Sequence, residues 1–333
     1  MVTVTGTGTV PVSDDRRFCP LCLRWSDAFR VDRNGTPDRG CPQCHSLERH
    51  RFLALLLPTL IARADAKVVL DIAPTQMLSA LFDRLVPRRV GMDFDPGADG
   101  RTVNCRASLT DLPLPDASID LILCSHVLEH VPDDLAAMRE LARVLAPGAT
   151  GVVAVPQRRG RPTDEDPSAS PSERVRRFGQ ADHVRYYGDD FAERLRSSGL
   201  AYDAITPAQL LPAAVVRTCA LTPSETFWLV RSAAPDATGR QASSARPGIV
   251  LEDLGAAALG ELMRLLAAAD ANHTIASSQD RTLLVRAEQR RQRAVASALR
   301  TRTQYEQLIG RPPMRVALLV WRGIRRVRAR TRR

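Results

Sequence analysis

The segment IDLILCSHVLEH, residues 119–130, decides the fold class of this 333-residue chain. Its first half is a mostly apolar run of strand length, and its second half is rich in polar and ionisable side chains. Pro132 and Asp133 follow closely, and proline is tolerated in the first turn of a helix. The segment therefore predicts a buried strand that ends in polar residues and leads into a helix. In open α/β sheets this carboxyl edge is where ligands bind.

Strands and helices are expected to alternate on both sides of this segment. The patterns predict strands at 68–72, 89–93, 103–106, 118–124 and 151–155, helices at 75–86, 133–145 and 189–198, and last strands within 204–211 and 226–230. Short strands separated by helices are typical of a doubly wound, parallel α/β sheet, here over residues 67–232. Residues 161–177 are expected to be an irregular insert, either a lid over a substrate or a plain surface loop.

Four of the seven cysteines form two C-x-x-C pairs separated by eighteen residues. The pairs are Cys19 with Cys22 and Cys41 with Cys44. This spacing is typical of a structural zinc site in which four thiolates surround Zn²⁺ tetrahedrally. It predicts a zinc ribbon over residues 17–46. Free thiols or transient disulfides are the alternative interpretation.

A connecting helix is expected over residues 47–66, with Ser46 as its N-terminal cap. Its leucines recur at helical spacing and predict one buried face. Its basic residues Arg49, His50 and Arg51 are expected to form a solvent-exposed face.

The net charge of +10 belongs almost wholly to one end of the chain. Residues 311–333 contain nine arginines and no acid, which leaves +1 for the rest. The basic composition therefore does not by itself indicate a nucleic-acid-binding body. The start of the chain has neither a basic segment nor an apolar core, so we expect no secretory signal and a cytoplasmic protein. No apolar run reaches the roughly 20 residues that span a bilayer.

The regions outside the expected sheet are assigned from composition. Residues 1–16 are expected to be a flexible leader, 233–247 a linker, and 248–310 a helical extension that forms a hairpin or a coiled coil for self-association. Residues 311–333 combine apolar residues, a tryptophan and arginines. This basic amphipathic tail is predicted to lie on the anionic inner membrane face. RNA phosphates, or packing against the body of the protein, are the alternatives.

Several blocks of the chain, taken together, resemble class I S-adenosylmethionine-dependent methyltransferases of the type 11 group. They are VLDIAP (69–74), VGMD (90–93), LPLPDASID (112–120), HVLEHV (126–131) and RELARVLAPG (139–148). Together with the cysteine pairs, SLERHR (46–51) and FGQADHVR (178–185) also resemble a bacterial subgroup with an N-terminal zinc ribbon. The resemblance implies a Rossmann-like methyltransferase sheet and S-adenosyl-L-methionine as cofactor.

The resemblance also implies where the cofactor binds. Asp71, at the end of the first strand, corresponds to an acid near the methionine ammonium, and Asp93 to a carboxylate that accepts both ribose hydroxyls. The other residues implied are Ala73, Phe94, Ser108, Leu109, Cys124 and Ser125. The chain departs from the family at the first turn, where residues 73–76 contain no glycine. It also has Ser108 where many relatives have an aspartate.

Catalysis would require a base if the acceptor is a hydroxyl. His126 and His183 are the candidates, because imidazole titrates near neutrality. Asp182 is expected to orient His183, and Arg185 to bind an anionic group of the substrate. The neighbouring pair at 129–130 has an alternative role as a buried polar pair that fixes the loop.

These features predict methyl transfer to a hydroxyl of a small molecule or glycan. An RNA methyltransferase is the alternative enzyme. A cofactor-binding scaffold without catalysis is the alternative outside enzymes.

Overall fold

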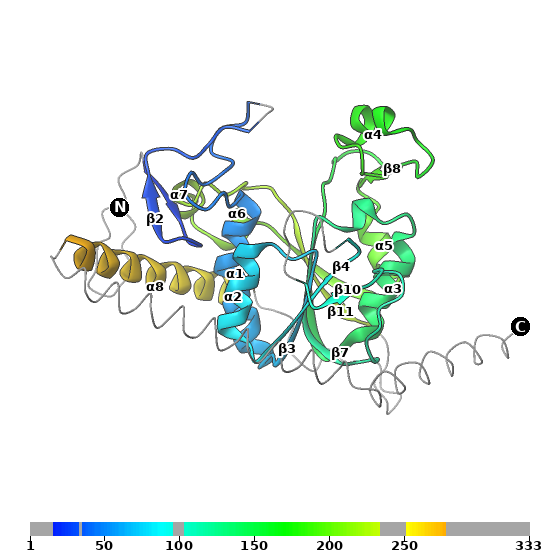
Figure 1. The fold of residues 1–333 in the computed structure, drawn as a ribbon, viewed down its shortest axis with the longest axis horizontal. Helices are drawn as coiled ribbons and strands as arrows, with labels where there is room; N and C mark the ends of the chain where they lie inside the picture. The colour runs from blue at the N-terminus through cyan, green and yellow to red at the C-terminus, as the bar shows by residue number, and fades with distance from the viewer. Residues whose placement is uncertain (1–15, 33–34, 96–102, 234–250, 278–333) are drawn as a thin grey trace, which may run out of the picture. The chain divides into compact units, whose positions relative to one another are not determined.

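The computed structural model describes residues 16–32, 35–95, 103–233 and 251–277. The largest element within these residues is a seven-stranded sheet (Figure 1). Its strands are β3 (Val68–Ile72), β4 (Arg88–Asp93), β5 (Cys105–Arg106), β6 (Ile119–Ser125), β7 (Leu145–Ala154), β10 (Leu200–Ile205) and β11 (Phe227–Ser232). The predicted α/β sheet is confirmed.

The order of strands across the sheet is β10-β11-β7-β6-β3-β4-β5. Strands β3 to β7 run parallel, whereas β11 is antiparallel to both β7 and β10, so the sheet is mixed rather than fully parallel. The chain moves outward from β3 to β5 and then returns to β6 on the other side of β3. The strand order therefore reverses between β3 and β6, and such a switch point is where ligands bind in open α/β sheets.

Helices cover both faces of the sheet (Figure 1). One face carries α1 (Glu48–Ala64) and α2 (Gln76–Leu85), and the other carries α3 (Asp134–Val144) and α5 (Phe191–Ser197). Helix α3 begins where Asp133 accepts a hydrogen bond from the amide of Ala136, at 2.9 Å. Its apolar residues recur at helical spacing and are fully buried: Ala137, Met138, Leu141 and Val144.

Two expected strand boundaries are wrong for local reasons. The strand expected within 204–211 is β10, which ends at Ile205. Thr206 caps the short helix α6 (Pro207–Leu210), whose first residue is a proline, and this cap stops the strand. Strand β7 begins at Leu145 instead of residue 151, because residues 146–149 form a bulge opposite Asp120.

The insert at residues 161–177 is ordered rather than irregular. Strand β8 (Asp164–Glu165) pairs with β9 (Arg185–Tyr186), and α4 (Pro171–Phe178) lies between them in the chain. Arg177 pairs with Asp164 at 2.5 Å and with Asp166 at 2.9 Å. These contacts give the segment a defined structure that composition alone did not suggest.

The N-terminal region is a small antiparallel hairpin of β1 (Arg17–Cys19) and β2 (Arg24–Ser26). Arg51 of α1 attaches it to the rest of the fold. Its guanidinium is fully buried and donates to the carbonyls of Asp38, Arg39, Ser46, Cys219 and Ala220, at 2.6 to 3.1 Å. A buried arginine is tolerated here because its donors have oxygen acceptors.

The expected solvent-exposed basic face of α1 is therefore wrong. Arg51 is inaccessible, His50 is 7% exposed, and Arg49 is partly buried. Ser46 is not the cap either, since the cap position is Leu47 and the Ser46 hydroxyl lies against cysteine sulfurs. The helix also continues through Pro58 to Ala64, because its leucine face is buried.

The C-terminal extension contains one described helix, α8 (Leu251–Ser277). It ends at Ser277, and the rest of the expected extension, to residue 310, lies outside the described residues, so the hairpin or coiled coil stays a prediction. Leu254, Ala258 and Leu262 of α8 are buried, and Gly255 approaches the carbonyl of Leu210 too closely for a side chain. Among the described residues, no helix has the length and apolarity that a bilayer crossing requires. The expected leader, linker and basic tail lie outside the described residues.

Candidate active site

A cavity of about 740 Å³ opens at the carboxyl edge of the sheet. The ends of β3, β4 and β6 line it, together with the start of α2 and the first turn of α1. The predicted cofactor residues that line it are Asp71, Ala73, Asp93, Phe94, Ser108, Leu109 and Ser125. Cys124 is the exception, because its side chain is fully buried in the core and is not part of the lining.

Asp71 is a buried carboxylate beside two donors. It is 1% exposed, accepts a hydrogen bond from the Ser79 hydroxyl at 2.9 Å, and lies 3.6 Å from the Arg89 guanidinium. Burial raises the pKa of Asp71 to about 7, although Ser79 and Arg89 both act to lower it. A cation bound in the cavity would favour the charged form of this side chain.

Asp93 lies at the end of β4, next to Asp71 in the sheet. The register pairs Asp71 with Gly91, so the two carboxylates stand at the tips of adjacent parallel strands. Asp93 accepts a hydrogen bond from the amide of Asp95 at 3.0 Å. Phe94 follows and is 71% exposed at the cavity wall, which gives the cavity an apolar surface beside a carboxylate.

The turn after β3 adopts the conformation that usually favours glycine. Ala73 has a φ of 48°, and its amide donates to the carbonyl of Met92 at 2.8 Å. A left-handed conformation costs a residue with a side chain roughly 1–2 kcal/mol. The glycine-free turn therefore keeps the shape of a glycine turn at a cost in stability.

Two hydroxyls that line the cavity have no hydrogen-bond partner among the described residues. They are the buried Oγ1 of Thr75, at the start of α2, and the buried Oγ of Ser125, at the end of β6. Buried polar atoms are costly unless they are paired. Their position suits a polar ligand that would hydrogen-bond to both sides of the cavity.

Arg49 and His50 also line the cavity, and sequence analysis did not assign them to it. Arg49 has no hydrogen bond or ion pair with any other described residue. His50 accepts a hydrogen bond from the amide of Leu47 through Nδ1, at 3.3 Å, so its proton is on Nε2. Burial, with the nearby Arg49, lowers the pKa of His50 to about 3, so this ring is neutral at pH 7.

His126 occupies the cavity wall between two glutamates. Its Nδ1 lies 3.3 Å from Glu129, and its Nε2 lies 3.8 Å from Glu225. Burial lowers its pKa, but the two carboxylates more than offset this, and the net pKa is raised. His126 also has a φ of 56°, and its amide donates to the carbonyl of Ala154 at 2.8 Å. The residue whose ring lines the cavity therefore has a strained backbone, as residues of functional sites often do.

The other predicted catalytic residues have different positions from those expected. Asp182 lines the cavity but lies 3.1 Å from Nδ1 of His130, and not beside His183 as expected. His183 is 5% exposed and does not line the cavity, and its Nδ1 donates to the carbonyl of Phe178 at 3.0 Å. Burial lowers the pKa of His183.

Arg185 is not available to an anionic substrate group. It is 1% exposed, pairs with Glu165 at 3.1 Å, and donates to the carbonyls of Leu128, Val131 and Pro132. These carbonyls belong to the loop after β6. Arg185 therefore fixes this loop, and the expected substrate contact is wrong.

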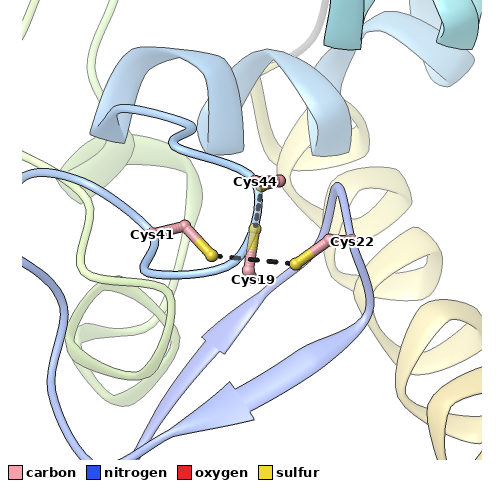
Figure 2. A group of neighbouring side chains, drawn as sticks. All are labelled: Cys19, Cys22, Cys41 and Cys44. Atoms are coloured by element: carbon pink, nitrogen blue, oxygen red, sulfur yellow. Dashed lines mark hydrogen bonds between the residues drawn. The ribbon is translucent and has the colours of Figure 1, made fainter.

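The four cysteines of the two C-x-x-C pairs converge (Figure 2). Their ligand atoms all lie within 4.8 Å of one another, with Cys19 and Cys44 sulfurs 3.6 Å apart and Cys22 and Cys41 sulfurs 3.7 Å apart. Tetrahedral zinc with Zn–S bonds of about 2.3 Å would place neighbouring sulfurs about 3.8 Å apart. The cluster has the donor set and the dimensions of a structural zinc site.

A family model matches the central part of the chain. The sequence from residue 70 to residue 153 matches the family model described as a methyltransferase domain. This segment is therefore similar to methyltransferase domains. It contains the tips of β3, β4 and β6 that line the cavity.

The chain is also similar to parts of two curated proteins. The 27-O-demethylrifamycin SV methyltransferase of Amycolatopsis mediterranei is 32% identical over 125 residues, 36% of this chain and 43% of that protein. The ubiquinone/menaquinone biosynthesis C-methyltransferase of Xanthomonas oryzae pv. oryzae is 40% identical over 96 residues, 29% of this chain and 34% of that protein. The chain thus spans less than half the length of either relative.

A solved structure also aligns with the chain. It comes from a complex of the Haloferax volcanii Trm112 methyltransferase activator with a methyltransferase. The TM-score is 0.37 at 21% identity, and the alignment covers 55% of this chain and 91% of that chain.

Proposed function

We propose that this protein is an S-adenosylmethionine-dependent methyltransferase. The observation that carries the proposal is the pair of carboxylates, Asp71 and Asp93, at neighbouring strand tips on one cavity of about 740 Å³. The cofactor has a cationic amino-acid end and a ribose with two hydroxyls. Both ends donate hydrogen bonds, and a carboxylate that accepts from each is what such a ligand requires.

The rest of the cavity suits the remaining parts of this cofactor. Phe94 and Leu109 supply apolar surface for an adenine, and Ser108 is a polar group beside them. The start of α2, with the unpaired hydroxyl of Thr75, and the guanidinium of Arg49 suit a carboxylate, because helix N-termini and arginines both favour anions. Thr75 Oγ1 has no hydrogen-bond partner among the described residues, and a bound carboxylate would leave it paired.

His126 is the proposed general base. When bound, S-adenosylmethionine supplies an activated methyl group on its sulfonium. A hydroxyl acceptor must lose a proton as it is methylated, and His126 can accept this proton at the cavity wall. Glu129 and Glu225 favour the protonated ring and so make His126 a stronger base.

A small molecule or glycan is the proposed acceptor class. Both relatives described above carry the names of small-molecule methyltransferases, which supports this class over RNA. One name specifies an oxygen and the other a carbon, so the choice of a hydroxyl is supported by His126 rather than by the relatives. We place the protein in the cytoplasm, where S-adenosylmethionine is made.

A structural Zn²⁺ is proposed for Cys19, Cys22, Cys41 and Cys44. Four thiolates close the coordination shell and leave no position for a substrate. Arg51 donates to carbonyls of the cysteine region and to those of Cys219 and Ala220, which follow α7 (Ala213–Thr218). The metal would therefore stabilise the surroundings of the first turn of α1, from which Arg49 and His50 reach the cavity.

Methyl transfer can be tested without a known acceptor. S-adenosylhomocysteine release is measured after the zinc-loaded protein is mixed with S-adenosylmethionine and pools of hydroxylated small molecules, glycans or RNA. We expect release with a small-molecule or glycan pool, and a loss of at least tenfold with His126→Gln while cofactor binding is retained. Release with RNA alone would contradict the proposed acceptor, and full turnover by the variant would contradict the proposed base.

A further inference from the structure

A second group of ligand-type side chains lies beside the cavity, separate from the four cysteines. Glu129, His130 and His183 each offer one ligand atom, and these three atoms lie within 4.8 Å of one another. Glu129 and His130 belong to the single turn η2 (Leu128–His130) after β6, and His183 comes from the segment before β9. The rings of the two histidines meet edge to face, with centroids 4.6 Å apart.

Both histidines have one ring nitrogen fixed by an oxygen acceptor. Nδ1 of His183 donates to the carbonyl of Phe178 at 3.0 Å, and Nδ1 of His130 lies 3.1 Å from the carboxylate of Asp182. This leaves Nε2 of each ring as the nitrogen available to a ligand. Metal-binding histidines characteristically hold their other nitrogen in this way, on a carbonyl or a carboxylate.

The carboxylate of Glu129 is buried without a hydrogen bond from any described residue. Its side chain is 0% exposed, and neither of its oxygens has a hydrogen-bond partner among the described residues. The carboxylate forms an ion pair with the His126 ring, whose Nδ1 lies 3.3 Å away. A buried carboxylate without hydrogen bonds is costly, and a cation beside it removes most of that cost.

The loop that carries these side chains is held rigidly. Arg185 donates to the carbonyls of Leu128, Val131 and Pro132, and the amide of Val184 donates to the carbonyl of Glu129 at 2.9 Å. These bonds join η2 to the segment that supplies His183. The three ligand groups are therefore fixed in relation to one another before any ligand binds.

We propose that Glu129, His130 and His183 bind one first-row divalent transition-metal cation. Two imidazoles and one carboxylate are a donor set that such ions prefer, and they leave coordination positions open. His130 lines the cavity, so the site borders it. Provided that the proposed methyltransferase function holds, the open positions would bind an oxygen of the acceptor and make its hydroxyl more acidic.

The alternative to a metal is the protonated ring of His126. In that case His126 alone would neutralise Glu129, and the two other histidines would be ordinary buried polar residues. The two arrangements predict different numbers of bound metal ions per chain. Counting the metal ions that the full chain binds, once its four-cysteine site holds zinc, distinguishes the two arrangements.

The test is a titration of this zinc-loaded full chain with Co²⁺, followed by visible absorption and by metal analysis after dialysis. We expect one further metal ion per chain, with d–d absorption but without thiolate-to-cobalt charge transfer. Glu129→Gln and His183→Gln should each weaken Co²⁺ binding at least tenfold. Glu193→Gln, at an exposed position of α5, is the matched control and should leave it unchanged.

Two results would overturn the proposal. One is wild-type protein that binds no metal beyond the four-cysteine site, which needs no variant to interpret. The other is a second ion that both variants bind as tightly as the wild type. Titration of the same samples with S-adenosylhomocysteine separates the metal-site proposal from the methyltransferase proposal. If the protein binds no second metal ion but still binds S-adenosylhomocysteine, only the metal-site proposal fails.

Discussion

Replacing Asp71 by asparagine probes the most deeply buried carboxylate of the proposed cofactor site. Asp71 is 1% exposed, and its burial raises its pKa to about 7 from an ordinary value of 3.8. The Ser79 hydroxyl can still donate to an asparagine at this position, because the amide oxygen remains an acceptor. The variant therefore removes the titrating group and keeps its shape.

The raised pKa fixes the sign of the effect on stability. Between about pH 4 and pH 7 the folded protein binds more protons at Asp71 than the unfolded chain does, so its contribution becomes less favourable as pH rises. A shift of about three pKa units costs roughly 4 kcal/mol once the pH exceeds the folded pKa. Of this cost, about 1 kcal/mol develops between pH 6 and pH 8.

The assay is urea unfolding of the zinc-loaded wild type and Asp71→Asn at pH 6 and pH 8. We expect the variant to gain about 1 kcal/mol in free energy of unfolding, relative to the wild type, between the two pH values. Effects common to both pH values, such as the loss of a partner for Arg89, cancel in this difference. Asp65→Asn, at an exposed carboxylate, is the control and should show no such gain.

The same variant should bind the cofactor less tightly. S-adenosylhomocysteine is the better probe, because it lacks the sulfonium that makes the amino group of S-adenosylmethionine more acidic. We expect at least tenfold weaker binding by Asp71→Asn at pH 8. A stability difference that does not change with pH would refute the buried, titrating carboxylate, and unchanged binding would refute its contact with the ammonium.

Three other changes test separate parts of the site. Ala73→Gly should raise the free energy of unfolding by about 0.5 kcal/mol, because glycine relieves the strain at a φ of 48°, and a destabilised variant in urea unfolding would contradict this. Cys22→Ser should lose the zinc detected by metal analysis, whereas Cys105→Ser, outside the four-cysteine cluster, should retain it. Arg49→Met should weaken S-adenosylhomocysteine binding about tenfold or more in calorimetry, as expected for a lost charge-assisted hydrogen bond, and full affinity would exclude the carboxylate contact.

The parts of the fold that sequence predicts are those that depend on local pattern. The apolar runs of β3 and β6 are long enough to identify buried strands, and their polar ends identify the ligand-binding edge. Asp71 and Asp93 follow from this pattern together with the family resemblance. The two C-x-x-C pairs likewise predict that their four sulfurs lie close together, because this spacing is the one that a four-cysteine zinc site requires.

The parts that sequence does not predict depend on packing between distant segments. Arg49 and His50 lie in the first turn of α1, before its buried leucines, and nothing in that pattern shows which neighbouring element covers them. Arg185 resembles a surface arginine in sequence, yet it donates to carbonyls more than 50 residues away. Asp182 contacts His130 rather than its neighbour in sequence, because η2 and the segment before β9 lie side by side.

The most direct test of the proposed function is isothermal titration of the zinc-loaded full chain with S-adenosylmethionine. We predict one binding site per chain, at least tenfold weaker binding by Asp93→Asn, and unchanged binding by the exposed control Asp65→Asn. Wild-type protein that binds no S-adenosylmethionine, or Asp93→Asn that binds it as tightly as the wild type, would contradict the assignment of this cavity to the cofactor.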